Sequence, residues 1–262
     1  VQVVDSSVAA NNGFYKISAV GSTTVTVYGE LAASSGSSAT VTMGSQILNG
    51  STQSSYTLER IYNDITAGQS GRCAQYTGCM IDGMTLNATT EAVVTGGFTW
   101  LGAKGSSLTT ESDTSPDAAS GKDVMNAIDD VNGVMEGSTY GSQTITAFSM
   151  ALSNNLRPRL QIGTLGAVSI GTGTCNVSGT FQRYYSDSTM IDKYLNFSDS
   201  SLAIIFEDVD GNAYCLDFPK IIYTSAQRVA GGQNQDLIAD MSWEAVRDDT
   251  EDITIRISKW SA

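Results

Sequence analysis

Short runs in which apolar and polar residues alternate, separated by Gly and Ser turns, dominate the beginning of the chain. Three such runs lie within the first fifty residues: "GFYKISAV", "TTVTVYG" and "SATVTMG". Alternation with a period of two is typical of strands with one buried face, and turns about every ten residues are typical of meandering β structure. We therefore predict a mainly β protein in which residues 1–50 form a small β-barrel or sandwich domain.

The composition supports the same class. The chain of 262 residues contains 26 Gly but only 3 Pro, which suits many short strands joined by tight turns. An apolar content of 41% is enough to bury a core in one large or two small domains. We expect residues 51–262 to form a larger β-sandwich domain.

Longer alternating segments continue through this second domain. A glycine pair at Gly96–Gly97 predicts a bend or bulge in its strand. The strand at 142–153 carries apolar residues on both faces, which predicts that it is covered on two sides. The predicted strands in this part of the domain are 54–65, 77–89, 92–103 and 142–153.

One helix is expected in the second domain. The segment "DSTMIDKYLN" at 187–196 follows a predicted strand and carries apolar residues at helical spacing. The next stretch, 201–219, reads as a hairpin turned by the two residues Asp210–Gly211, with Pro219 ending its second strand or lying at a sheet edge. Alternation at 236–248 and 251–260 completes the sheet.

Two intervening segments have weaker patterns. Residues 104–122, "KGSSLTTESDTSPDAASGK", contain one large apolar side chain and predict a long loop that contacts a partner or stays exposed to solvent. In the segment 122–137 the residues Val124, Ile128, Val131 and Met135 lie near helical spacing, which predicts a short helical or irregular segment.

The charge balance excludes one large class of function. Acidic residues outnumber basic ones by 27 to 14, for a net charge of −13. Such a surface repels a polyanion, so binding to nucleic acid is not expected. Repulsion is still useful to a protein that lets nucleic acid pass without sticking.

The sequence contains no histidine, which removes the usual proton shuttle and the Ser-His and Cys-His nucleophile pairs. A carboxylate pair could still hydrolyse glycosides, and Asp208, Asp210 and Asp217 lie close in sequence. Aspartate is favoured beside a hairpin turn for backbone reasons, so a structural role is the better interpretation. We predict no catalytic residues.

No cofactor or metal site is predicted either. Counting back from Gly211 puts Phe206 where a calcium loop requires Asp. The glycines of "IGTGTC" lack the lysine of a phosphate-binding loop. Cys73, Cys79, Cys175 and Cys215 have neither paired spacing nor a histidine for zinc, and buried free thiols are favoured over a disulfide.

Aromatic residues allow one further kind of site. Trp100, Trp243 and Trp260, with 11 Tyr, could form a sugar-binding platform, although scattered aromatics are more often core or interface anchors. No apolar run approaches the ~20 residues that a membrane-spanning helix needs, and no secretion leader opens the chain. The first residue is Val1, which indicates a processed, partial or renumbered chain.

The order of these segments resembles the tail tube (major tail) proteins of bacteriophages with long, non-contractile tails, in the group with an additional small domain. The resemblance rests on collinear segments between about Ala10 and Val246. They are "NNGFYKISAV", "ATVTMGSQILNG", "SYTLERIYNDI", "YTGCMIDGMTLNA", "GGFTWLGA", "VMNAIDDVNGVMEG", "CNVSGTFQRYYSDSTMIDKYLN", "SLAIIFEDVDGNAYCLDFPKI" and "QDLIADMSWEAV". Relatives usually have a further segment before the part that matches Val1; the chain begins inside the family pattern, or its first strands are supplied differently.

The resemblance implies a β-sandwich with one flanking helix, assembled as hexameric rings that stack into a hollow tube. It implies a virion tail protein, made in the host cytoplasm, whose partners are its own copies and other tail proteins such as the tape measure and tail terminator. DNA would pass through the lumen without specific binding. Two alternatives remain at this point: a monomeric carbohydrate-binding or adhesin β-sandwich, and a glycosidase that works without histidine.

Overall fold

Strands make up most of the molecule, and a 13-stranded sheet contains the majority of them. The computed structural model describes residues 1–8, 11–29, 31–32, 39–113, 115–119, 121–137, 139–140 and 144–261. Every strand pairing in the described part of the chain is antiparallel. The predicted mainly β class with one helix is confirmed.

The large sheet folds into two packed layers that share the long strand β18 (Ala213–Ala230). Layer A contains the C-terminal half of β18 together with five further strands. In spatial order these are β9 (Thr95–Leu101), β8 (Cys73–Thr89), β13 (Ile145–Ser153), β16 (Asn176–Tyr184) and β19 (Leu237–Ala245).

Layer B contains the N-terminal half of β18. Its other strands are β6 (Ser45–Leu48), β20 (Arg256–Trp260), β17 (Ser200–Glu207), β11 (Val131–Glu136) and β12 (Thr139–Tyr140). Residues of both layers form one core cluster, which includes Phe148 and Phe181 of layer A and Ile204 of layer B. This arrangement confirms a β-sandwich.

A bend in β18 joins the two layers. Trp243 pairs with Tyr223 in the ladder, yet its ring lies 4.8 Å from the ring of Phe218, five residues earlier in β18. A straight strand would separate residues five apart by about 16 Å. The bend coincides with Pro219 and with a register shift between Tyr223 and Ser225.

The N-terminal residues lie against layer B. Phe14 is buried, and its ring packs edge-on against Trp260 at 5.1 Å. The strand β6, inside the predicted 1–50 domain, pairs with β20. The remaining strands form a three-stranded sheet and a hairpin. They are β1 (Gln2–Val4), β2 (Gly13–Phe14) and β5 (Thr40–Thr42), and β3 (Ile17–Val20) with β4 (Val25–Val27).

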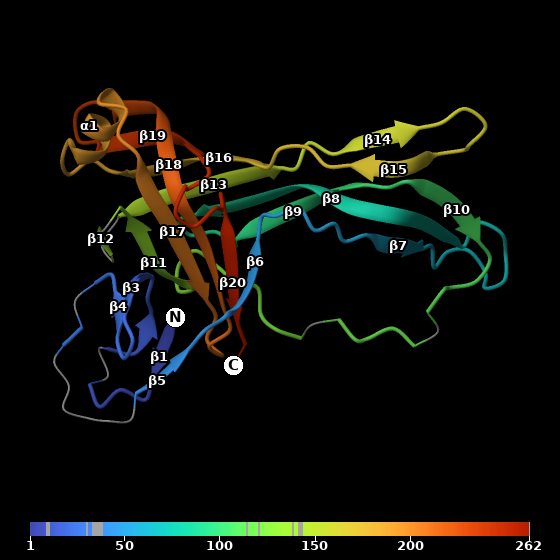
Figure 1. Cartoon of the computed structure of the whole chain (residues 1–262), viewed down its shortest axis with the longest axis horizontal. Helices are drawn as coiled ribbons and strands as arrows, with labels where there is room; N and C mark the ends of the chain where they lie inside the picture. The colour runs from blue at the N-terminus through green and yellow to red at the C-terminus, as the bar shows by residue number, and fades with distance from the viewer. Residues whose placement is uncertain are drawn as a thin grey trace.

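Layer A extends sideways into an elongated arm (Figure 1). The first half of β8 leaves the sandwich and pairs with β7 (Tyr56–Ile61) on one side and β10 (Lys104–Leu108) on the other. A separate hairpin, β14 (Arg157–Leu160) and β15 (Ala167–Gly171), follows β13 and lies along the arm. The backbone N–H of Ala167 donates to Ala103, which holds this hairpin on the arm.

The single helix α1 (Thr189–Leu195) confirms the prediction for 187–196. Met190 and Ile191 are buried in the shared core, while the Asp187 carboxylate accepts a hydrogen bond from the Thr189 N–H at 2.9 Å. The helix therefore has the expected apolar face and a polar residue that accepts from one N–H of its first turn.

The helical interpretation of 122–137 is wrong. Residues Val131–Glu136 form β11, which pairs with β17 through a bulge between Val131 and Gly133. Met135 is buried, whereas Val124 and Ile128 are exposed, so the residues at helical spacing do not share a face. Tertiary pairing with β17 overrides the local pattern here.

The predicted loop 104–122 begins later than expected. Residues 104–108 form β10, since Lys104 pairs with Thr77 and Leu108 with Cys73. A Ser/Gly-rich edge strand has no apolar alternation to reveal it. Positions 114 and 120 of this segment lie outside the described residues.

Two details of layer A differ from the sequence predictions. The bulge lies at Asp82 of β8, where the register shifts between Ile81 and Gly83, and not at Gly96–Gly97. Strand β13 begins at Ile145, positions 142 and 143 lying outside the described residues. Its second face is only half-buried, with Ala151 exposed, so the expectation of two covered faces is wrong for the single chain.

The hairpin of β17 and β18 turns at the predicted place with a longer loop. The N–H of Asp208 donates to the Asn212 carbonyl, and Gly211 has a φ of 84°. This is a three-residue loop with glycine in the left-handed region, not a two-residue turn. Pro219 lies within β18, between the residues paired with β20 and those paired with β19, rather than at an end or an edge.

Candidate assembly surfaces

Layer A has an uncovered strand at each side. In the part of the chain that the structure describes, β9 pairs only with β8, and the segment 222–230 of β18 pairs only with β19. Each edge therefore has a row of backbone N–H and C=O groups without a ladder partner. The seven residues of β9 correspond to an edge of about 24 Å.

The directions of the two edge strands allow them to pair with each other between copies of the chain. Successive strands from β9 to β18 are all antiparallel, so after six strands β18 runs opposite to β9. If β18 of one copy lay beside β9 of the next, the pair would again be antiparallel. The sheet could therefore continue from copy to copy without changing its hydrogen-bond pattern.

The two edges carry few of the residues that usually prevent pairing. Strand β9, "TGGFTWL", contains no charge and no proline, and Arg228 is the one charged residue in the segment 222–230. Phe98 of β9 is 57% exposed. Soluble proteins normally protect edge strands with charges, proline or bulges, so these edges have the composition of contact surfaces.

The face of layer A opposite the core is lined with small polar side chains. Cross-strand neighbours such as Ser149 and Thr180, whose hydroxyl oxygens lie 2.8 Å apart, continue across the sheet in register. We call this set the polar face. Its members are Thr85, Asn87, Ser149, Ala151, Ser178, Thr180, Gln182, Asp240, Ser242 and Glu244.

The charge on the polar face has a single sign. Asp240 and Glu244, both on β19, are its only charged members. Asp240 is half-buried and Glu244 is exposed. A surface of hydroxyls and amides whose only ions are carboxylates offers no cation to a phosphate backbone.

The three tryptophans predicted as a sugar platform do not lie together. Trp243 and Trp260 are buried in the core. Trp100 alone is half-buried on the arm, where its ring lies 5.7 Å from Tyr56 and 6.3 Å from Phe98. The structure thus forms a different aromatic cluster from Tyr56, Phe98 and Trp100, beside the open edge of β9.

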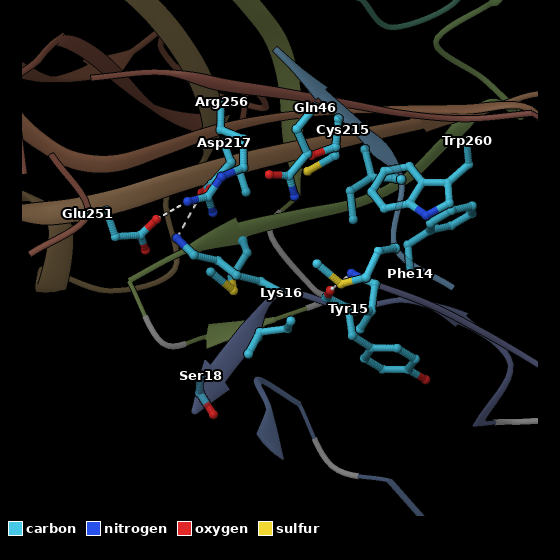
Figure 2. A pocket seen from close by; sticks show the side chains of 18 of the residues that line it. Phe14, Tyr15, Lys16, Ser18, Gln46, Cys215, Asp217, Glu251, Arg256 and Trp260 are labelled. Carbon is cyan, nitrogen blue, oxygen red and sulfur yellow. Dashed lines mark hydrogen bonds and ion pairs between the residues drawn. The ribbon is translucent and has the colours of Figure 1, made fainter. Parts of the chain in front are cut away.

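The cavity shown in Figure 2 lies between the N-terminal residues and layer B. It has a volume of about 400 Å³. Asp217 is buried at its wall and forms ion pairs with Lys16 at 2.8 Å and with Arg256 at 3.2 Å. Arg256 also pairs with Glu251. These ion pairs link the N-terminal segment to β18 and β20.

The cavity contains a thiol that is not activated. Burial, with the Asp217 carboxylate adding to it, raises the pKa of Cys215 to about 12, so the thiol is protonated at neutral pH. All four cysteines are free in the structure, with Cys73 and Cys79 fully buried. Within the described ranges, no group of three or more His, Cys, Asp or Glu side chains is arranged to hold a metal ion.

The structure separates the three aspartates considered for glycoside hydrolysis. Asp208 accepts hydrogen bonds from the backbone of Asp210 at 2.9 Å and of Asn212 at 2.8 Å, as expected for a turn residue. Asp210 forms an ion pair with Lys122 at 2.8 Å. Asp217 lies in the cavity with its cationic partners.

A buried polar network that sequence reasoning missed connects α1 to the sandwich. Glu136 accepts hydrogen bonds from Lys193 at 2.7 Å, Ser200 at 2.6 Å and Tyr223 at 2.8 Å. Burial and the neighbouring Glu136 carboxylate raise the pKa of Tyr223. Glu136 is at least 57 residues from each of its donors in the sequence, and the four residues belong to no local pattern, so no signal in the chain could have revealed the network.

A comparison with protein-family models matches residues 10–245, nearly the whole chain, to the phage tail tube protein family. A search of curated proteins returned no match. None of the helices in the described ranges has the length and apolarity to cross a bilayer. The extent of the family match and the β-sandwich with one helix agree, and the chain belongs to the phage tail tube proteins, structural components of the virion tail.

Proposed function

We propose that this tail tube protein assembles into closed rings, hexameric as the family resemblance implies, and that the rings stack into a tube through which the genome leaves the virion. The observation that carries the proposal is the pair of open, antiparallel edges at β9 and β18. Joining these edges around a ring gives the backbone groups of both edge strands of layer A their partners.

The polar face would then line the bore. Each copy contributes Asp240 and Glu244, so a ring carries a band of carboxylates toward the lumen. Salt screens such charges over roughly 8 Å at physiological ionic strength, so only residues that line the bore act on the DNA. DNA passes such a wall without specific contacts.

The proposal includes partners and location. Copies of the chain contact one another within and between rings, and the finished tube meets other tail proteins such as the tape measure and the tail terminator. The protein is made in the host cytoplasm and has a structural rather than a catalytic role. The buried ion pairs of Asp217 and the protonated Cys215 support that assignment.

Negative-stain electron microscopy and light scattering of the purified chain test the proposal, because rings and tubes are expected. A Phe98→Lys variant places a charge beside the open edge of β9 and should reduce ring formation at least tenfold. Val20→Lys is the matched control, since Val20 is also an exposed apolar strand residue, 72% exposed, away from layer A. Strictly monomeric wild-type protein under all conditions would refute the proposal.

A second candidate is a monomeric carbohydrate-binding module, which the exposed cluster of Tyr56, Phe98 and Trp100 favours. This alternative predicts glycan binding that is lost on Trp100→Ala, together with particles that never exceed one chain. Ring formation in the absence of any glycan would exclude it as the main function.

A further inference from the structure

The tip of the β14–β15 hairpin exposes three large apolar side chains. Leu160, Ile162 and Leu165 are 75%, 101% and 93% exposed. The hairpin lies along the arm (Figure 1) and is held there through Ala167, which pairs with Leu160 next to the turn 161–166. Apolar exposure concentrated at one hairpin turn indicates a contact site rather than scattered surface residues.

The hairpin is basic in an acidic protein. It carries Arg157 and Arg159, and the sequence contains no Asp or Glu between residues 137 and 186. The Arg157 guanidinium donates to the Thr172 carbonyl at 3.0 Å. Both arginines are exposed, and neither has an ion pair within the described residues. We call Leu160, Ile162, Leu165 and Arg159 the hairpin tip.

A surface of opposite charge lies elsewhere on the molecule. The turn between β17 and β18 lies beside the segment 126–130, where the Glu207 N–H donates to the Asp130 carbonyl. The two segments enclose a shallow acidic hollow that Val209 borders. The hollow also has exposed apolar neighbours, since Val209 is 86% exposed and Ile128 is exposed too. Six acidic residues and one basic residue occupy 122–130 and 207–210.

We propose that the hairpin tip of one copy docks on this acidic hollow of a second copy, in the next ring of the stack. This inference rests on the proposed ring assembly and names the surfaces that would couple the rings. Strands of a closed barrel tilt by about 35–45° to its axis, so an arm that prolongs the strands of layer A extends beyond its own ring. Apolar tip and apolar rim, with arginine facing carboxylate, make the two surfaces complementary.

Cross-linking tests the contact directly. Chains carrying both Ile162→Cys and Val209→Cys, treated with a short bismaleimide, should give a ladder of covalent multimers on denaturing gels. The matched control pairs Ile162→Cys with Val20→Cys, since Val20 is exposed but lies away from the acidic hollow. Each single variant and the wild type report any background from the native Cys175 and Cys215.

Charge reversal tests the energetics. Asp129 is exposed, and Arg159→Glu or Asp129→Arg alone should shorten the tubes at least fivefold while rings persist. The double variant, which restores opposite charges, should recover tube length. Normal tubes in both single variants, or the absence of a 162–209 cross-link in tubes that do form, would overturn the docking while the ring proposal stands. Failure of the wild type to form rings would overturn both.

Discussion

The indole of Trp243 lies directly over Gly179, its cross-strand partner in layer A. A Cβ atom at position 179 would come within 2.6 Å of the Trp243 ring and would also overlap the Ser149 carbonyl oxygen. The ring also packs on Phe148 and Phe218, which limits how far it can shift. Glycine at 179 is therefore a packing requirement of the core, not a turn signal.

Replacing Gly179 by alanine should destabilise the chain by about 1–3 kcal/mol, since overpacking a core forces side chains and backbone to shift. The midpoint of urea unfolding, followed by tryptophan fluorescence, measures the effect. Gly97→Ala is the control, because a Cβ at Gly97 meets no atom closer than 3.6 Å. Equal midpoints for the two variants would contradict the packing role of Gly179.

Glu136 is the acceptor on which a buried network depends. A Glu136→Ala variant leaves the Lys193 ammonium and the Tyr223 hydroxyl without their acceptor, which should cost about 3–5 kcal/mol. Tyr223→Phe removes one donor and leaves the carboxylate with two others, so a loss of about 1 kcal/mol is expected. Denaturant unfolding of both variants checks the order; a larger loss for Tyr223→Phe would contradict it.

Asp187 should make stability depend on pH at the start of α1. Hydrogen bonds from Thr189, and further ones from Ser186, lower the pKa of Asp187 to about 2. A lowered pKa in the folded state stabilises the fold above the unfolded value of about 4, and this contribution is lost as the pH falls toward 2.

An Asp187→Asn variant should therefore be less stable than the wild type by about 1 kcal/mol at pH 7, and the difference should shrink between about pH 4 and pH 2. Thermal unfolding at a series of pH values measures it. Asp249→Asn, an exposed residue away from the helix, is the control. A difference that stays constant down to pH 2 would contradict the assignment.

The carboxylates of the polar face should set the response of assembled tubes to DNA. Replacing Asp240 and Glu244 by lysine puts cations on the proposed bore wall, so tubes should retain short duplex DNA at low salt and release it at high salt. Fluorescence anisotropy with a labelled duplex detects retention. Asp249→Lys changes the charge outside the polar face, and the same retention by this control would argue against a bore lined by layer A.

Local sequence patterns predicted several elements of the fold. The helix at 187–196 was predictable because Met190, Ile191, Tyr194 and Leu195 lie at helical spacing, with Asp187 just before the first turn. The turn at Asp208 to Asn212 was predictable because glycine at 211 has the positive φ that the loop needs. In contrast, β11 was misread as helical, because its identity depends on pairing with β17 rather than on its own spacing.

The candidate surfaces were less accessible to sequence reasoning. The family resemblance predicted that copies of the chain join through sheet edges. It did not identify which strands form those edges. The segment 222–230 is an edge only because β17 begins at Ser200, opposite Ile221, and so has no residues beside 222–230. Similarly, the exposure of Leu160, Ile162 and Leu165 depends on where the hairpin lies in the fold, and their apolar character alone would place them in a core.

By itself, the sequence determined the mainly β class, the single helix, the acidic surface and the family, because these depend on local periodicity, composition and the order of segments along the chain. Only the tertiary structure decided where β18 bends between the two layers, which strand edges stay unpaired and which residues donate hydrogen bonds to Glu136. The physical reason is that ladder pairing and buried polar contacts join residues distant in sequence, and the free energy of such contacts is not recorded in any local pattern.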